Sequence, residues 1–255
     1  MTRNTKYTYA LGKGCGLVEE TLSLLSICDE TTTKESLAQY VHDCNFLAKC
    51  SDLRSMDIVK LVFYPRFMKH NPKVACWLRT IREHGLLLSR FKQLLMIYCA
   101  RENAIMYDFI LSQFNDLREN NVQRLEKKVL TDFVDGIVEQ GLAKWGDAAK
   151  RRQCTYIKSA LVDFDMLTTR GEILPYNIDN FTVLYLMHEL HFAGLSDMAI
   201  WNHEDWRLFG LDRYAVQQRI LDQNIKGGYI AQCSGELLTI SWNHQTMEEF
   251  INATI

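Results

Sequence analysis

The sequence predicts a mainly α-helical protein, with a helical bundle followed by winged-helix-like modules that carry small β-hairpins. Apolar residues recur at helical spacing through most of its 255 residues. Only 3 prolines and 13 glycines occur, which is few for an all-β chain of this length. Two short alternating runs, 229–233 and 237–242, flank a loop that contains Gly235, as in a β-hairpin.

The first 120 residues predict the N-terminal helical bundle. Thr32 and Glu35 have the spacing of a capping box, and Pro72 and Gly85 are placed to begin and end a later helix. The longest periodic pattern, 86–115, thins near Arg101-Glu102-Asn103, where we expect a bend. Helices are therefore expected at about 15–28, 32–44, 52–63 (ending before Pro65), 71–85 and 86–115.

Residues 121–255 predict a C-terminal winged-helix-like region of two modules, about 121–178 and 179–255, packed against the bundle. In the first module, a helix over 124–144 and a second helix after Gly146-Asp147 precede a turn and strand at 168–176. In the second module, three helices precede the hairpin; they begin near Asp179, Ser196 and Asp212.

The second helix of the first module carries a basic face. Arg151, Thr155, Lys158 and Val162 recur at helical spacing and point away from its apolar stripe, as on the recognition helix of a winged helix. A solvated surface helix shows the same pattern, so the face alone is a weak signal. The residues expected to contact DNA are Lys150, Arg151, Arg152, Thr155, Lys158 and Arg170, with Arg79, Arg82 and Lys92 as extensions.

Composition limits the function. The formal net charge is −2, so nucleic-acid binding would require local clustering of charge. The 8 cysteines include no Cys-x-x-Cys pair, which predicts buried free thiols in a reducing compartment. No apolar run is long enough to span a bilayer, and the N-terminus lacks the apolar core of a signal peptide. We expect a cytoplasmic protein that does not bind membranes.

Two segments resemble reactive motifs but are incomplete. The GKGCG segment at 12–16 lacks the Gly-Lys-Ser/Thr ending of a phosphate-binding loop. His188 and His191 are three residues apart, whereas the metalloprotease helix requires four. We interpret His188 as a surface residue and His191 as a residue at the edge of the core.

Cys154 has basic neighbours, Arg151 and Arg152, which would lower the pKa of its thiol. A cysteine nucleophile also needs a histidine placed beside it, which the sequence does not show. We therefore expect no enzymatic activity, no metal and no cofactor.

Three parts of the chain carry a family resemblance. The segments 93–109 (QLLMIYCARENAIMYDF) and 160–172 are two of them, and a set of positions within 182–250 is the third. The set comprises Tyr185-Leu186, Leu190, Gly194-Leu195-Ser196, Ile200, Trp206-Arg207-Leu208-Phe209, Val216, Gly235, Ile240-Ser241-Trp242 and Met247-Glu248-Glu249. In these spacings the chain resembles the BrxA family of bacteriophage-exclusion (BREX) defence systems over about two-thirds of its length. The first 60 residues add little to the resemblance.

The resemblance implies a monomeric, mostly helical cytoplasmic protein that is similar in part to the RNA-binding antitermination factor NusB. It further implies that the protein binds double-stranded DNA. The protein would act together with the methyltransferase, ATPase and phosphatase-like components of the defence system. It supplies no motif-defined binding residues, so the DNA contacts named above come from helical geometry alone.

The leading hypothesis is a non-catalytic DNA-binding accessory protein of a BREX-type system that contacts the duplex through its basic helix and wing. One alternative is a protein–protein adaptor, favoured by the nearly balanced charge of 212–222, with Trp201 or Trp206 as exposed anchors. The other is RNA binding of the NusB type.

Overall fold

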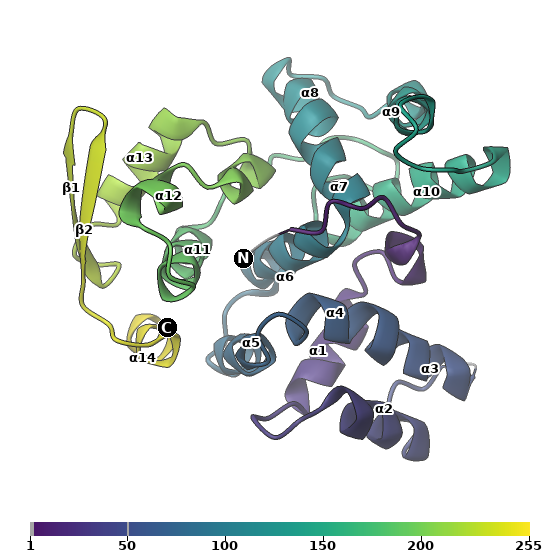
Figure 1. Ribbon diagram of the computed structural model, residues 1–255, viewed down its shortest axis with the longest axis horizontal. Helices are drawn as coiled ribbons and strands as arrows, with labels where there is room; N and C mark the ends of the chain where they lie inside the picture. The colour runs from purple at the N-terminus through teal and green to yellow at the C-terminus, as the bar shows by residue number, and fades with distance from the viewer. Residues whose placement is uncertain (1–2, 50) are drawn as a thin grey trace. The chain divides into compact units, whose positions relative to one another are not determined.

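The computed structural model describes residues 3–49 and 51–255, and it is mostly helical (Figure 1). Within this part of the chain, the sheet is one antiparallel hairpin of β1, Tyr229–Ser234, and β2, Leu237–Trp242. The predicted mainly α fold class is confirmed. The chain forms two compact units: the larger contains the chain up to residue 79 and 95–175, and the smaller contains 80–94 and 176–255.

The larger unit is entirely helical apart from short connections. Its elements before residue 80 are η1 Ala10–Lys13, α1 Val18–Ser26, α2 Lys34–Asp43, α3 Asp52–Ile58, η2 Val59–Phe63, α4 Tyr64–Phe67 and the start of α5 Lys73–Glu83. Its later elements are the end of α6 Leu88–Glu102, then α7 Ala104–Phe109, η3 Ile110–Phe114, α8 Asn115–Glu119, α9 Lys127–Glu139 and α10 Asp147–Asp163.

The long periodic pattern is bent where the sequence predicts it. Asn103 leaves the helical region with φ −121° and ψ 91° and separates α6 from α7. Its side-chain amide donates to the Cys99 carbonyl oxygen at 2.7 Å, so the interruption is fixed by a buried hydrogen bond. Arg101, two residues before this interruption, is only 6% exposed.

The expected helix end before Pro65 is wrong. The helix that begins at Asp52 passes through the π-helical segment Val59–Phe63 into α4. Pro65 directly follows the π-helical segment, in which the Tyr64 N–H donates to the Val59 carbonyl oxygen five residues back.

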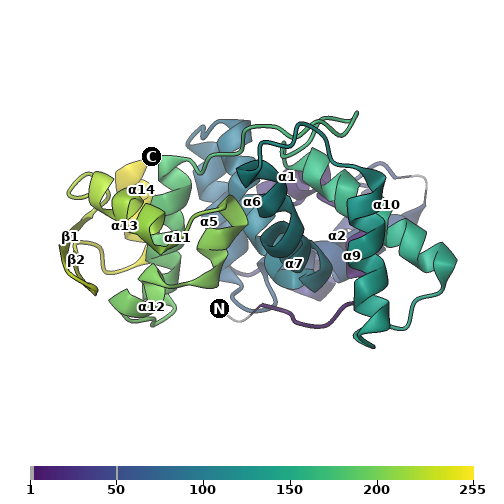
Figure 2. The same ribbon diagram turned by 90° about the horizontal axis from the view of Figure 1, so that it is seen from above.

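The smaller unit contains helices that pack around α11, in which residues 181–190 are all buried. Its elements are the remainder of α5 and α6, then α11 Asn180–Phe192, α12 Asp197–Trp201, η4 Glu204–Phe209, α13 Arg213–Asp222, β1, β2 and α14 Met247–Thr254. The hairpin lies beside α12 and α13 in both views (Figures 1 and 2). Asp197 ties α12 to β2, because its Oδ2 accepts from the Ile240 N–H at 2.9 Å.

The first of the two expected C-terminal modules differs from the structure in its strands. The module expected at 121–178 has isolated bridges, Arg124 with Glu172 and Leu167 with Ile173, in place of a regular strand pair. The expected boundary near residue 120 does not coincide with the limits of the compact units, and a division of the chain there stays a prediction. No helix within the described residues is long and apolar enough to cross a bilayer.

His188 is buried in the smaller unit, so its interpretation as a surface residue is wrong. Its ring stacks on Phe250 at 3.8 Å, and Nδ1–H donates to the Leu184 carbonyl oxygen at 2.9 Å. Nε2 has no hydrogen-bond partner. Burial, with smaller contributions from His244 and His191, lowers the pKa of His188 to about 3, so the folded protein holds a neutral ring.

This burial predicts acid sensitivity. Below pH 6.5, the ordinary pKa of histidine, the unfolded chain binds a proton that the folded His188 does not. The free energy of unfolding should therefore fall as the pH drops, by about 1.4 kcal/mol per pH unit between about 6.5 and 3. His188→Phe removes this dependence, so urea titrations should show the variant gaining roughly 2 kcal/mol on the natural protein between about pH 7 and pH 5. Identical pH dependence in both proteins would contradict this account.

Candidate nucleic-acid interface

Helix α10 presents two different faces. Gln153, Ile157 and Ala160 on one face are fully buried, whereas Arg151 and Thr155 on the other are exposed. The buried face packs against the N-terminal segment around η1 and against α7. This arrangement confirms the predicted separation of an apolar stripe from a basic face.

The GKGCG segment at 12–16 packs closely on α10 and does not form a phosphate-binding loop. A Cβ at Gly12 would overlap the ring of Tyr156, and a Cβ at Gly16 would overlap Asp163. The Gly16 N–H donates to Asp163 Oδ2 at 2.7 Å, so this N–H group does not face a phosphate. The glycines are there because backbone and helix approach too closely for side chains.

Arg66, in α4, also holds this segment through its backbone. The guanidinium is 6% exposed and donates to the carbonyl oxygens of Cys15 at 2.6 Å and of Gly16 at 3.2 Å. Because one face of α10 is held by these contacts, the basic face is fixed on the other side of the helix.

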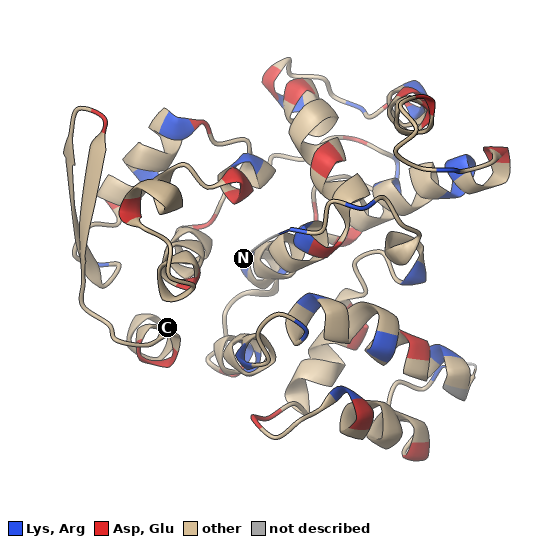
Figure 3. Ribbon diagram, in the orientation of Figure 1, with Lys and Arg blue, Asp and Glu red and all other residues tan. Residues whose placement is uncertain are grey.

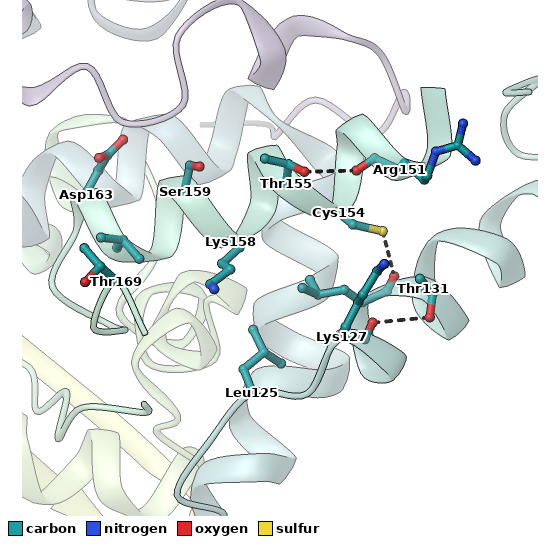
Figure 4. Close-up of a pocket in the computed structure, with 12 residues that line it drawn as sticks. Leu125, Lys127, Thr131, Arg151, Cys154, Thr155, Lys158, Ser159, Asp163 and Thr169 are labelled. Atoms are coloured by element: carbon teal, nitrogen blue, oxygen red, sulfur yellow. Dashed lines mark hydrogen bonds between the residues drawn. The ribbon is translucent and has the colours of Figure 1, made fainter. Parts of the chain in front are cut away.

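That basic face lines a groove between α10, α9 and the turn that follows α10 (Figure 4). The groove has a volume of about 710 Å³. It brings together three cations, several hydroxyl groups and an aliphatic floor. The lining residues are Leu125, Lys127, Leu130, Thr131, Arg151, Cys154, Thr155, Lys158, Ser159, Val162, Asp163 and Thr169.

The turn at one side of the groove depends on Gly171. Its φ of +89° lies in the left-handed region that favours glycine. Antiparallel hydrogen bonds hold the turn: the Leu125 N–H donates to the Gly171 carbonyl oxygen at 2.9 Å, and the Thr168 N–H donates to that of Glu172 at 2.9 Å. The Lys158 side chain reaches this turn, since its Nζ lies 3.6 Å from the position of a Cβ on Gly171.

The structure brings only some of the predicted contact residues together. Arg151, Thr155 and Lys158, three of the residues expected to contact DNA, line the groove. Lys150 does not, because its ammonium pairs with Asp135 at 2.7 Å and Asp147 at 3.3 Å. These hydrogen bonds, to Asp135 first, raise the pKa of Lys150.

The remaining predicted cations lie outside the groove. Arg152 and Arg170 are exposed, on α10 and on the turn. Arg79 donates to the Cys28 carbonyl oxygen at 2.9 Å, and Arg82 donates to that of Leu86 at 2.9 Å. Both arginines therefore donate to backbone carbonyl oxygens, and neither lines the groove. Lys92, proposed as an extension, does not line it either.

Lys127 lines the groove and was missed by the sequence reasoning. It is the first residue of α9, whose first turn contains no acidic residue. Lysine at this end adds to the positive end of the helix dipole and strengthens the local potential. The sequence shows the lysine but not that α9 packs on α10, so helical spacing alone could not find it.

Acidic residues limit how far the positive potential extends. Figure 3 shows basic and acidic positions interspersed along α9 and α10, in keeping with the net charge of −2. The positive character of the groove is therefore local, set by Lys127, Arg151 and Lys158.

Cys154 is not an activated thiol, contrary to the expectation from its neighbours. Its side chain is 7% exposed, and Sγ contacts the Leu130 carbonyl oxygen at 3.5 Å. Burial, followed by the charge of Asp135, raises the pKa of Cys154. Lys127 and Lys150 oppose this shift without overcoming it.

The expected exposure of two tryptophans is corrected in the smaller unit. Trp201 and Trp206 are 3% and 1% exposed, so neither is a surface anchor. Among the described residues, no group of three His, Cys, Asp or Glu side chains is arranged to hold a metal ion. The described cysteines are free thiols, while Cys50 lies outside the described residues.

The fold and the groove define a mainly helical protein with a local basic face on one helix pair. The sequence model of the BrxA family matches residues 5–189, so the chain belongs to the BrxA family and hence to BREX-type phage defence. The match includes residues 5–60, a part of the chain that added little to the resemblance. It ends before most of the positions in 182–250 that carried the resemblance.

The fold is similar to that of a solved structure. An uncharacterized protein from Magnetospirillum magneticum aligns with a TM-score of 0.62 at 14% identity, covering 80% of this chain and 98% of that chain. At this identity the similarity concerns the fold alone. No curated protein matches the sequence.

The close packing of GKGCG on α10 predicts a glycine-specific cost. Gly16→Ala forces Asp163 away and should lower the free energy of unfolding by about 1–3 kcal/mol. Gly136→Ala is the matched control, because nothing lies within 4 Å of its added Cβ in the interior of α9. It should raise the free energy of unfolding by about 0.5–1 kcal/mol. Chemical denaturation measures both, and a loss that is equal at the two positions would contradict the packing account.

Proposed function

We propose that the protein is a non-catalytic accessory protein of its BREX-type system that binds duplex DNA through the face of α10 and the adjoining turn. The observation that carries the proposal is the convergence of Lys127, Arg151 and Lys158 on one groove. Arg152 and Arg170 are exposed beyond its lining and extend the set toward solvent. Lysine and arginine side chains clustered in this way bind a phosphate backbone without reading base sequence.

The geometry favours backbone contact over base reading. A recognition helix enters the major groove as a convex surface. The basic face of α10 instead lines a concavity, and on it Cys154 is buried while Lys158 is half-buried. Lys127, Arg151, Arg152 and Arg170 are the members of the set that are exposed. We therefore expect little sequence specificity from this surface.

A second candidate function is docking onto another component of the defence system through the smaller unit. Tyr214 is 68% exposed and Leu237 is 66% exposed. Arg213 joins their elements, since Nη2 donates to the Glu236 carbonyl oxygen at 3.3 Å. Exposed aromatic and aliphatic side chains of this kind are typical anchors of protein interfaces. Loss of co-purification of a BREX component after Tyr214→Ser with Leu237→Ser, with DNA binding intact, would favour this role.

Duplex binding should depend steeply on salt. Five phosphate contacts, from Lys127, Arg151, Arg152, Lys158 and Arg170, predict that log K falls by about 4–5 for a tenfold rise in salt, at about 0.9 for each contact. A mobility-shift titration across salt concentrations measures the slope. A flat salt response, or no shift at low salt, would overturn the proposal, and tighter binding of structured RNA in competition would redirect it to RNA.

Charge reversal should locate the contact. Arg151→Glu with Arg152→Glu places two negative charges at the groove and should weaken duplex binding by at least about tenfold. Lys6→Glu with Lys226→Glu is the matched control, because it changes the net charge equally at exposed positions that do not line the groove. Equal weakening by both pairs would show that only the overall charge matters.

A further inference from the structure

The interior of the groove is not explained by contact with a duplex. Leu125, Leu130 and Val162 line it beside its cations, and its volume is about 710 Å³. A double helix is too wide to enter a space of this size, so phosphates that rest on the exposed cations leave these aliphatic side chains uncovered. An apolar lining beside a few polar and charged groups is typical of a site for a ligand that carries both kinds of group.

The groove is elongated along α10. Its lining residues on this helix, spaced three and four positions apart, run from Arg151 to Val162. At a rise of 1.5 Å per residue, this stripe is about 17 Å long. That length matches about five residues of an extended chain or about three turns of a helix. A linear segment of a protein therefore fits the groove better than a compact ligand does.

The cations of the groove have no counterion within the described part of the chain. No acidic side chain there pairs with Lys127, Arg151 or Lys158. Their sequence neighbours Lys128 and Lys150, in contrast, both pair with aspartates. Lys127 and Lys158 extend into the space between α9, α10 and the turn (Figure 4). Positive charge that the protein itself does not balance favours an anionic ligand.

Two hydroxyl groups of the groove offer hydrogen-bond acceptors to a ligand. The Thr155 hydroxyl donates to the Arg151 carbonyl oxygen at 3.1 Å, and the Thr131 hydroxyl donates to that of Lys128 at 2.8 Å. Because each hydroxyl hydrogen is used within its own helix, the lone pairs of the oxygens remain for a ligand. A peptide backbone supplies N–H donors for them, whereas a sugar–phosphate backbone has none.

We propose that the groove docks a short acidic segment of a partner protein. The carboxylates of this segment pair with Lys127, Arg151 and Lys158, and an apolar side chain packs on Leu130 and Val162. The segment and duplex DNA compete, because both use the same cations. This competition rests on the proposed function, whereas the docking itself does not.

The test selects random peptides of about 12 residues, displayed on phage, on the immobilised full chain at low salt. This length covers the groove as either a strand or a helix. We expect enrichment of peptides that combine Asp or Glu with Leu, Ile or Phe. A fluorescein-labelled synthetic copy of an enriched peptide then gives its affinity by fluorescence anisotropy. Replacing its acidic residues by their amides should weaken binding by at least about tenfold.

Two variants locate the binding. Thr155→Trp fills the groove, because Thr155 is an exposed residue that lines it, and should weaken peptide binding by at least about tenfold. Thr155→Ser keeps the hydroxyl and should behave as the natural protein. Lys127→Glu with Lys158→Glu should cause a similar loss, whereas Lys6→Glu with Lys226→Glu, which changes the net charge equally, should stay within about twofold. Thermal melting shows which variants are folded, and the lysine pair carries the test if Thr155→Trp is not.

The outcomes separate the two proposals. Enrichment of no acidic peptide overturns the inference, as does peptide binding that the groove variants leave unchanged. Displacement of a labelled duplex by the peptide supports the shared use of the cations, and simultaneous binding of both overturns it. Failure of the duplex to bind counts against the proposed function only, because the peptide selection and its anisotropy measurement involve no DNA.

Discussion

The packing of the N-terminal glycine segment on α10 is the constraint on which the candidate site depends. Gly12 and Gly16 approach the helix so closely that Tyr156 and Asp163 leave no room for a Cβ. Arg66 also holds the segment, because its guanidinium donates to the carbonyl oxygens of Cys15 and Gly16. Because these contacts occupy one face of α10, its cations must lie on the opposite face, where α9 and the Gly171 turn complete a groove.

Only some of the cations near α10 line the groove. Lys150 is adjacent to Arg151 in sequence, but its ammonium forms ion pairs with Asp135 and Asp147, which balance its charge. Lys127 comes from a different helix and joins Arg151 and Lys158. Burial keeps the thiol of Cys154 protonated, so the chemistry on offer is charge, hydroxyl groups and an aliphatic floor. This composition suits binding of a polar anion.

Much of the fold could be predicted from the sequence, because periodicity and turn residues are local signals. The bend at Asn103, the hairpin around Gly235 and the basic face of α10 all follow from spacing. Which segments pack against one another does not follow from spacing. Helical spacing showed neither that His188 is buried against Phe250 nor that Lys127 meets Arg151, because each depends on segments that are distant in the chain. The GKGCG motif also does not show that its glycines allow the backbone to pack closely on α10.

The central claim is that the basic face of α10 contacts nucleic acid, and lysine footprinting tests it most directly. Lysines are acetylated with and without duplex DNA, and their modification is read by mass spectrometry. The account predicts that DNA protects Lys158 and Lys127, while Lys6 and Lys226, exposed positions outside the groove, react as before. Unchanged reactivity of Lys158 and Lys127 with bound DNA, together with protection elsewhere, would contradict it.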